Sequence, residues 1–182
     1  GQLAPEQPQN GEPRTGLSMG DHAAITAREL KVTRADQDQL ALESHQKLHQ
    51  AWEEGFFTDL TTSFLGVNRD TNLRADSTLE KLGQLKPVFG KRDAQQHGTQ
   101  ATMTAGNSTP LTDGASVALL GNEDWAAQHN LEPLAYLVDS ETAAVDFIHG
   151  GDGLLMAPTY AVPRLLERNG LSLQDFDFYE VH

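Results

Sequence analysis

Residues 104–115 combine small, hydroxyl-bearing and turn-forming side chains between two apolar stretches, in the order T-A-G-N-S-T-P-L-T-D-G-A. Glycine lets a backbone approach a bound molecule closely, and hydroxyl groups can hydrogen-bond to it. Asparagine and proline favour a defined turn. The segment therefore suits a ligand held by backbone and hydroxyl groups, although a loop between two strands explains the same composition equally well.

Residues 69–92 form a basic island in an acidic chain. The 182 residues carry a formal net charge of −13, whereas this stretch holds six Lys or Arg against three Asp or Glu, a net of +3. Concentrated positive charge is typical of a site for a compact anion, such as the phosphates of a coenzyme. A solvated helix face with an adjoining loop is the alternative interpretation.

The acidic net charge argues against unaided binding to nucleic acid or to an anionic membrane, because both require a basic surface. The sequence also contains no run of about 18 apolar residues, the length that spans a bilayer, and no apolar region typical of a secretory signal. We therefore expect a cytoplasmic protein with no nucleic-acid partner and no membrane span.

The sequence contains no cysteine, which excludes disulfides, thiolate zinc sites and thiol nucleophiles within these residues. His45 and His49 are four residues apart on one face of an expected helix, but the sequence suggests no third ligand for a metal. We therefore expect no metal site and no covalently bound cofactor, and we interpret these histidines as surface residues.

Helix signals occur in five stretches, residues 20–30, 33–54, 78–85, 122–130 and 156–169. Asp21 and Asn122 are expected N-caps, and Thr33 with Asp36 forms an acidic variant of the capping box. Residues at spacings of three and four predict one buried stripe along the second helix, consisting of Leu40, Ala41, Ser44, Leu48, Ala51 and Trp52.

Strands are expected at residues 58–66, 115–121, 134–140 and 175–182, and from residue 102 onward their alternation with helices is typical of βαβ units. Residues 1–17 are rich in Pro and Gly, and residues 90–100 are polar, so both are expected to be loops. A buried strand is a poor natural terminus. We therefore expect the chain to be the middle piece of a longer enzyme.

Two blocks far apart in the sequence resemble motifs of the thiolase family. Residues 104–115 resemble its signature T-A-G-N-x-S/T-x-L-x-D-G-A. Residues 33–57 resemble the helix pattern S/T-R-x-x-Q-D-x-x-A-x-x-S-x-x-K-A-x-x-A-x-x-x-G-x-F, with Leu48 where alanine is usual. Further matches follow in family order at residues 18–20, 78–89 and 179–182. The chain looks nearest to 3-ketoacyl-CoA thiolases of trifunctional-complex type, which carry His where most thiolases carry Asn.

The resemblance implies an α/β fold, a thiolase-like fragment with an α/β loop domain and incomplete βαβ pieces of the two core halves. It places the CoA-binding loop domain at residues 1–106. The end of the N-terminal core half would be residues 107–136, and the start of the C-terminal core half would be residues 137–182. Family members form dimers and tetramers, so we expect a homodimer or homotetramer of the full-length enzyme.

The resemblance also implies site residues. The positions that match coenzyme A contacts of the family are Ser18, Met19, Arg74, Phe89, Ala105 and Thr109. A guanidinium at Arg74 suits both adenine stacking and phosphate charge, and Thr109 replaces the commoner serine. Ordinary packing is the alternative explanation for Met19 and Phe89. His182 is the expected catalytic residue, because it matches the first position of the N/H-E-A-F element that helps to form an oxyanion hole, although the E-A-F is missing here.

The implied activity is that of an acyl-CoA C-acyltransferase of fatty acid metabolism and β-oxidation, which cleaves a 3-ketoacyl-CoA with CoA or condenses acyl-CoA units. Coenzyme A and its thioesters would be the substrates and partners. The nucleophile and a second catalytic residue of the family are cysteines, so this chain would supply the CoA-binding cover and be inactive alone. A non-catalytic CoA, acyl-CoA or lipid-carrier binding module of the same fold is the alternative.

Overall fold

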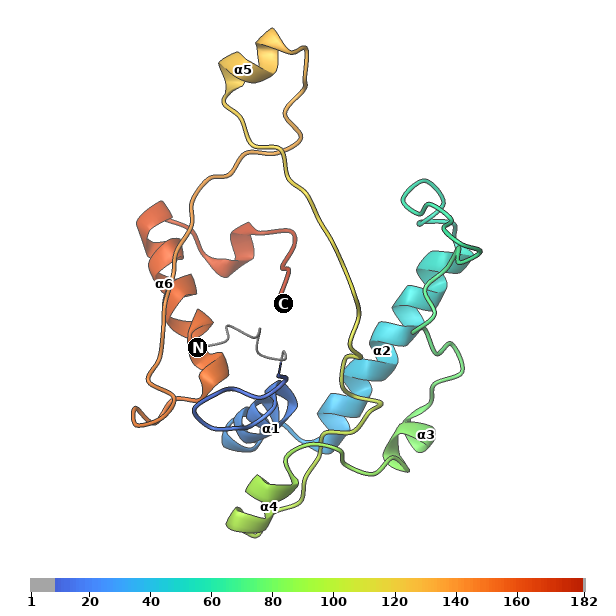
Figure 1. Cartoon of the computed structure of the whole chain (residues 1–182), viewed down its shortest axis with the longest axis vertical. Coiled ribbons are helices and arrows are strands. Elements are labelled where there is room, and N and C mark those ends of the chain that lie inside the picture. The colour runs from blue at the N-terminus through green and yellow to red at the C-terminus, as the bar shows by residue number, and fades with distance from the viewer. Residues whose placement is uncertain (1–8, 182) are drawn as a thin grey trace, which may run out of the picture. The chain divides into compact units, whose positions relative to one another are not determined.

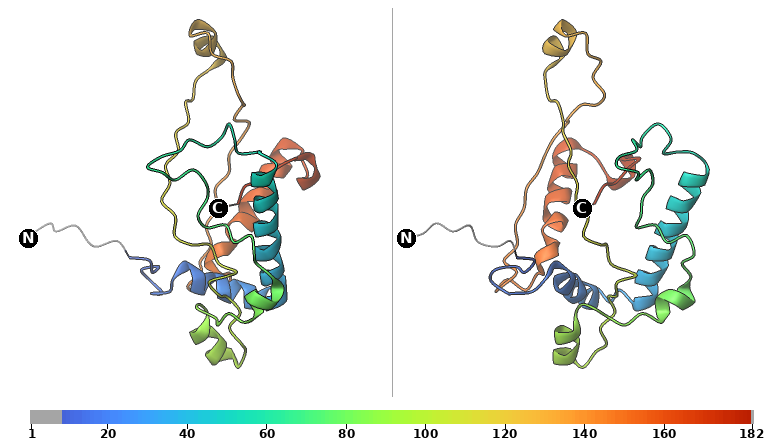
Figure 2. Two further views of the ribbon diagram at one scale, coloured as in Figure 1. Left: turned by 90° about the vertical axis from the view of Figure 1, so that its right-hand side faces the viewer. Right: turned by 45° about the vertical axis from the view of Figure 1, so that its right-hand side comes forward.

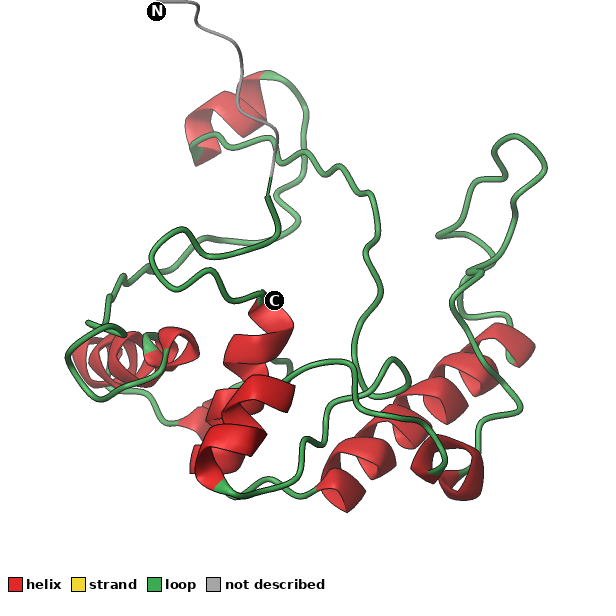
Figure 3. Cartoon of the chain, turned by 60° about the horizontal axis from the view of Figure 1, so that its bottom comes forward, coloured by secondary structure: helices red, strands yellow, loops and turns green. Residues whose placement is uncertain are grey.

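The computed structural model describes residues 9–181, and the chain divides into two compact units, Gly1–Leu111 and Thr112–His182. Helices joined by long loops make up each unit (Figure 1). Figure 3 shows helices and loops only, and the described residues contain three isolated β-bridges in place of a sheet. Each unit is therefore held by helix packing and by contacts that its loops make.

The described part of unit 1 contains four helices, α1 (Met19–Glu29), α2 (Arg34–Glu53), α3 (Leu79–Gly83) and α4 (Lys91–His97). Helix α1 packs against α4, and α3 packs against α2 (Figure 2). The buried apolar side chains of the described residues are Ala24, Leu82 and Ala94, one from each of α1, α3 and α4. Because this apolar core is small, polar contacts must carry much of the packing in unit 1.

Capping boxes begin α1 and α2. In α2 the Thr33 hydroxyl accepts a hydrogen bond from the Asp36 amide at 3.2 Å, which confirms the predicted cap. In α1 the predicted cap at Asp21 is wrong, because Ser18 is the N-cap and its hydroxyl accepts from the Asp21 amide at 3.1 Å. Asp21 is the third residue of that box and binds back to Ser18, so the helix begins one residue before the predicted start.

Helix α4 lies within residues 90–100, which the sequence predicted to be a loop. The helix has seven residues and little apolar character of its own. It is held by the burial of Ala94 and by Arg28 of α1, whose Nε donates to Asp93 at 2.7 Å. Arg28 and Asp93 are 65 residues apart, so the contact that holds this short helix could not be predicted from its own residues.

The predicted buried stripe of α2 is wrong at Leu40, which is 71% exposed, and at Ser44, which is also exposed. The buried side chain of α2 is Asp38, with 4% of its surface exposed. The reason is that α2 turns a polar side toward α3 and residues 102–107, where its side chains make hydrogen bonds.

Unit 2 contains α5 (Glu123–Gln128), the 3-10 turn η1 (Leu154–Met156), α6 (Pro158–Asn169) and the 3-10 turn η2 (Leu173–Asp175). Asn122 caps α5, since its Oδ1 accepts from the Trp125 amide at 2.8 Å. Helix α6 ends at Gly170, whose φ of 63° is a left-handed conformation that suits glycine. Both of these helix boundaries confirm the sequence prediction.

The strands expected at residues 58–66, 115–121 and 134–140 are wrong for the described chain, as is the described part of 175–182. Residues 58–66 contribute instead to a tight turn closed by the bridge between Phe64 and Val67. A strand is stabilised by hydrogen bonds to a neighbouring strand, and the described residues offer no such neighbour to these segments. An apolar sequence pattern alone therefore did not produce a sheet.

Within unit 2, Arg168 joins the end of α6 to residues 139–141. Its Nε donates to Asp139 Oδ2 at 2.8 Å, its Nη1 to Glu141 Oε2 at 2.6 Å and its Nη2 to the Ser140 carbonyl at 2.9 Å. The Asn169 amide also donates to Asp139 at 2.6 Å. The Arg168 hydrogen bond lowers the pKa of Asp139 and that of Glu141, because it favours the ionised carboxylates.

We expect this Arg168 bridge to open in acid. A carboxyl group whose pKa is lowered in the folded state adds stability above its ordinary pKa, about 4, and that stability is lost as the pH falls through the folded-state pKa. NMR of the Arg168 Nε–H as the pH is lowered from 7 to 1 would measure the opening. Arg164 is the control, because its Nε donates to the neutral Tyr160 carbonyl at 3.0 Å. An Arg168 signal that changes no more than that of Arg164 would contradict the expectation.

Candidate functional site

The motif loop, residues 104–109, is closed by its own side chains. Thr104 is fully buried, with 0% of its surface exposed. Its amide donates to Asn107 Oδ1 at 2.7 Å, and its hydroxyl accepts from the amides of Gly106 at 3.2 Å and of Asn107 at 3.3 Å. Threonine and asparagine thus satisfy the backbone of a tight turn, as the sequence pattern T-A-G-N suggested.

Asn107 joins this loop to α2. Its Nδ2 donates to Asp38 Oδ1 at 2.8 Å and to the Thr102 carbonyl at 3.1 Å. Arg34 completes the contact from the other side, with its Nε 2.7 Å from Asp38 Oδ2. The buried Asp38 carboxylate therefore has a charged donor on one oxygen and an amide donor on the other, which is the pairing that a buried charge requires.

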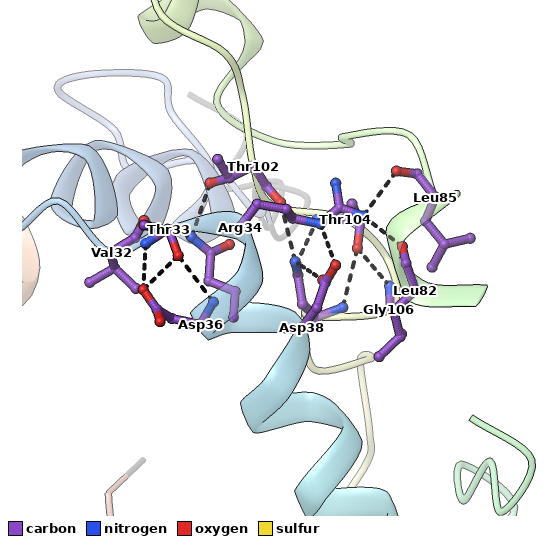
Figure 4. A network of polar contacts seen from close by, with 12 residues as sticks. Val32, Thr33, Arg34, Asp36, Asp38, Leu82, Leu85, Thr102, Thr104 and Gly106 are labelled. Atoms are coloured by element: carbon purple, nitrogen blue, oxygen red, sulfur yellow. Dashed lines mark hydrogen bonds and ion pairs between the residues drawn. The ribbon is translucent and has the colours of Figure 1, made fainter. Parts of the chain in front are cut away.

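Arg34 also reaches the end of α3. Its Nη2 donates to the Leu82 carbonyl at 2.6 Å and to the Leu85 carbonyl at 3.2 Å. Figure 4 shows Arg34, Asp38 and Thr104 in one network of polar contacts with Leu82 and Leu85. We call Arg34, Asp38, Thr104 and Asn107 the clamp network. It ties α2, the end of α3 and the motif loop together.

Further contacts support the clamp network. The Gln37 amide donates to the Thr102 hydroxyl at 3.0 Å and to the Val32 carbonyl at 3.3 Å. Gly106 lies so close to α3 and its end that an added Cβ would be 2.5 Å from Leu85 Cδ1 and 2.7 Å from Leu82 Cδ2. The absence of a side chain at residue 106 is therefore what lets the loop approach α3.

Two buried polar atoms at the motif loop lack a hydrogen-bond partner among the described residues. They are Ser108 Oγ and Gln37 Oε1. Buried polar groups are nearly always hydrogen-bonded in folded proteins. These atoms are therefore available to a group that the described residues do not provide.

The predicted residues Ala105 and Thr109 are on the exposed side of the motif loop. The clamp network holds the buried side of the same loop, through Thr104 and Asn107. Thr104 and Asn107 thus anchor the motif loop, whereas Ala105 and Thr109 are exposed to solvent on its other side. The sequence had singled out the presented pair, but it did not reveal which partners anchor the loop.

The predicted residues Ser18, Met19 and Phe89 belong to a neighbouring part of unit 1. The Ser18 hydroxyl is engaged in the α1 cap, where it donates to Asp21 Oδ2 at 2.7 Å, and Met19 is 53% exposed. Phe89 lies directly over Gly20, where an added Cβ would be 2.5 Å from the Phe89 ring. Phe89 thereby contacts the first turn of α1.

A short antiparallel contact connects Phe89 to the motif loop. Pro87 and Thr104 form an isolated bridge, and the Val88 amide donates to the Met103 carbonyl at 2.8 Å. The Phe89 amide approaches the same carbonyl at 3.4 Å. The start of α1, Phe89 and the motif loop therefore form one continuous series of contacts in unit 1.

Arg74 stands apart from this series, in the loop between α2 and α3. Its amide donates to His45 Nδ1 at 3.3 Å, and its Nη1 donates to the carbonyls of Thr71 at 2.9 Å and Leu73 at 3.1 Å. It forms no ion pair with any described residue. The remaining predicted site residue, the catalytic candidate His182, lies outside the described residues.

The other charges of the basic island are divided between paired and unpaired groups. Arg69 pairs with Glu53 at 2.8 Å and lies 5.1 Å from the centre of the Trp52 ring, and Lys81 pairs with Asp76 at 2.6 Å. The described residues supply no ion-pair partner to three further cations, Lys86, Lys91 and Arg92. Positive charge at the end of α3 and the start of α4 therefore remains available to an anion.

A cavity of about 190 Å³ lies between α1 and α4. Its lining consists of Thr15, Leu17, Asp21, Ile25, Gly90, Arg92, Asp93 and Gln96, and it includes none of the predicted site residues. Burial raises the pKa of Asp21, but hydrogen bonds from the Gly90 amide and from Ser18 outweigh it and hold the pKa below its usual value. This carboxylate is thus already used to join α1 to Gly90.

The described residues also limit the chemistry of the chain. No three of their His, Asp or Glu side chains gather as a metal site would require. None of their helices has both the length and the apolar character needed to cross a bilayer. What they offer is a held loop with exposed small and hydroxyl residues, an aromatic side chain beside it and unpaired cations in the same unit.

Comparison with known proteins gives consistent matches. Residues 11–124 match the family model described as thiolase, N-terminal domain. A 3-ketoacyl-CoA thiolase of Yersinia enterocolitica is 38% identical over 186 residues, covering 99% of this chain and 40% of its own length. One of Yersinia pestis is 39% identical with the same coverage. The chain thus spans about two fifths of the length of these curated relatives.

A solved structure is also similar. The crystal structure of the Bacillus anthracis acetyl-CoA acetyltransferase superposes with a TM-score of 0.74 and 33% sequence identity. The superposition covers 93% of this chain and 42% of that one. The path of the backbone is therefore similar over nearly the whole of the chain.

Proposed function

We propose a function for this chain from the premise that it belongs to the thiolase family, whose N-terminal domain model matches residues 11–124. The sequence predicted this membership and a thiolase-like fold, and the family match and the superposed acetyltransferase confirm both, although the described residues lack the expected strands. On this premise the chain is part of an acyl-CoA C-acyltransferase that cleaves 3-ketoacyl-CoA with CoA or condenses acyl-CoA units. Its own contribution is the cover that binds coenzyme A.

The observation that carries this proposal is the clamp network. It fixes one side of the motif loop to α2 and α3 and leaves Ala105 and Thr109 exposed on the other side. A loop held in this way presents small side chains, a hydroxyl and backbone groups to an extended ligand at little cost in ordering entropy. A pantetheine arm, which has amide groups and a slender chain, suits such a surface.

The remaining proposed contacts involve different parts of coenzyme A. Met19 and Phe89 offer apolar surface next to the motif loop, and Met adapts readily to a flexible chain. Arg74 and the unpaired cations of the basic island suit the phosphates. His182 would donate to the developing oxyanion in the complete enzyme. The predicted domain boundaries after residues 106 and 136, a cytoplasmic location and assembly as a homodimer or homotetramer complete the proposal.

Calorimetric titration of the 182-residue chain with coenzyme A tests the proposal. We expect binding, and we expect Arg74→Ala to raise the Kd about tenfold, because a charge-assisted contact to phosphate contributes about 1.5–3 kcal/mol. Arg164→Ala in unit 2 is the control for loss of one positive charge and should change the Kd less than about twofold. No heat at millimolar coenzyme A with a folded chain, or equal effects of the two substitutions, would contradict the proposal.

A binding module without catalysis is the second candidate, because the clamp network and the exposed side of the motif loop would serve binding in either case. Both candidates predict coenzyme A binding and no thiolysis by the 182-residue chain alone. They differ for a longer polypeptide that contains this chain. Turnover of a 3-ketoacyl-CoA by that polypeptide supports the acyltransferase, and binding without turnover supports the module.

A further inference from the structure

The chain contains two Asn-Gly pairs, Asn10–Gly11 and Asn169–Gly170, and every other asparagine precedes a residue that has a side chain. An asparagine side chain loses ammonia when the amide nitrogen of the next residue attacks its Cγ. Glycine permits this attack best, because it has no Cβ in the way and a freely adjustable backbone. These two pairs are therefore the places where the sequence favours spontaneous deamidation.

The reaction needs water and no other reagent. The bond between the glycine nitrogen and Cγ forms while the bond between Cγ and Nδ2 breaks, and Nδ2 leaves as ammonia with the former amide proton. Water then opens the resulting ring at either carbonyl, which gives aspartate or isoaspartate. Because the glycine amide must release its proton, an amide that donates to a carbonyl in the folded chain is a poor nucleophile.

Both reacting groups of the second pair are held by hydrogen bonds. Asn169 Nδ2 donates to Asp139 Oδ2 at 2.6 Å and to the Leu165 carbonyl at 2.8 Å. The Gly170 amide donates to the Glu167 carbonyl at 3.1 Å. Reaction at this pair therefore requires the end of α6 to open first.

The first pair is open to the reaction. Asn10 is exposed and belongs to no helix or strand. Neither its side chain nor the Gly11 amide makes a hydrogen bond within residues 9–181. Gly11 forms an isolated bridge with Ser18, and next to it the Glu12 amide donates to the Leu17 carbonyl at 2.8 Å. The pair thus joins an ordered turn while its own two reacting groups have no partner among the described residues.

We propose that Asn10 is a site of spontaneous deamidation, and that isoaspartate at this position opens the turn ahead of α1. Isoaspartate routes the backbone through the side chain, which adds one carbon to the chain immediately before Gly11. This added length shifts the register of the bridge to Ser18, the N-cap of α1. The inference goes beyond the proposed function and does not depend on coenzyme A binding.

The test incubates the folded 182-residue chain at neutral pH and follows both pairs by peptide mass spectrometry. We expect Asn10 to react at least about 20-fold faster than Asn169, because reaction at Asn169 waits for local opening. In concentrated guanidinium chloride neither pair is held by the fold, so the two rates should agree within about threefold. The comparison separates the effect of the structure from that of the local sequence.

A matched pair of substitutions checks the mechanism. In Gly11→Ala the added Cβ would have the Gly16 carbonyl oxygen as its nearest neighbour, at 3.4 Å, so the variant should fold. Its methyl group hinders the attack and should slow deamidation of Asn10 at least about tenfold. Gly114→Ala is the control, because an added Cβ there meets no atom within 4 Å. It should leave the rate at Asn10 unchanged.

Hydrogen exchange of the separated isoaspartate form tests the structural consequence. The Glu12 amide should exchange about tenfold faster than in the unmodified chain, since its contact with Leu17 is lost. The Ala94 amide, which donates to the Gly90 carbonyl at 2.9 Å, should exchange as before. The proposal is wrong if Asn169 reacts as fast as Asn10 in the folded chain, if Gly11→Ala reacts at the unsubstituted rate, or if Glu12 exchanges equally in both forms.

Discussion

Replacement of Asp38 by Ala is expected to lower the free energy of unfolding of unit 1 by about 3–5 kcal/mol, the cost typical of removing one partner from a buried ion pair. The substitution leaves Arg34 without its carboxylate and Asn107 Nδ2 without the acceptor at 2.8 Å. Urea unfolding measured by Trp52 fluorescence in a Trp125→Phe background would report unit 1 alone. The same variant should bind coenzyme A more weakly, because the motif loop loses its anchor on α2.

Asp59→Ala is the matched control, because Asp59 is exposed and has no hydrogen bond or ion pair within the described residues. It should change the free energy of unfolding by less than about 0.5 kcal/mol. If Asp38→Ala prevents folding, Asp38→Asn keeps the shape and one acceptor oxygen and should give an intermediate loss. Equal stability of Asp38→Ala and Asp59→Ala would show that the clamp network does not hold unit 1.

Sequence reasoning succeeded where short-range hydrogen bonds decide the structure. The cap of α2 by Thr33 and the cap of α5 by Asn122 both depend on a side chain and an amide three residues away. A local pattern contains all of that information. The cap of α1 was misplaced because Ser18 and Asp21 are both good caps, and the chain uses both in one reciprocal box.

Sequence reasoning failed where the partner is distant. Asp38 and Asn107 are 69 residues apart, and their contact is what orders the motif loop. Asp38 and Asn107 each lie inside one of the two motif blocks, so a signal was present: an acidic residue in a helix that was expected to bury an apolar stripe, and an asparagine in the motif loop. The strands expected in unit 2 failed for a related reason, because pairing needs a neighbour that the described residues lack.

Replacement of Asn107 by Asp is expected to destabilise unit 1 as strongly as the loss of Asp38, by about 3–5 kcal/mol at pH 7.5. The Thr104 amide can still donate to one oxygen of the new carboxylate. The other oxygen replaces Nδ2 and then faces Asp38 Oδ1 at 2.8 Å and the Thr102 carbonyl at 3.1 Å, two acceptors and no donor. Urea unfolding of Trp125→Phe variants at several pH values would measure the loss.

The loss should depend on pH in a direction that identifies its cause. Two carboxylates that share a buried site raise the pKa of the pair, so the folded variant holds a proton that the unfolded chain releases near pH 4. A raised folded-state pKa means that stability is retained below about pH 4 and lost as the pH rises through the folded-state value. Stability relative to the unsubstituted chain should therefore recover between pH 7.5 and pH 5.

Asn68→Asp makes the same chemical change at an exposed residue with no interaction among the described residues, and it should show neither the loss nor the recovery. This comparison separates the two possible origins of the effect. If Asn107→Asp destabilised unit 1 equally at every pH tested, the cause would be the lost amide donor alone. The Asp38 carboxylate would then lie farther from residue 107 than the 2.8 Å contact requires.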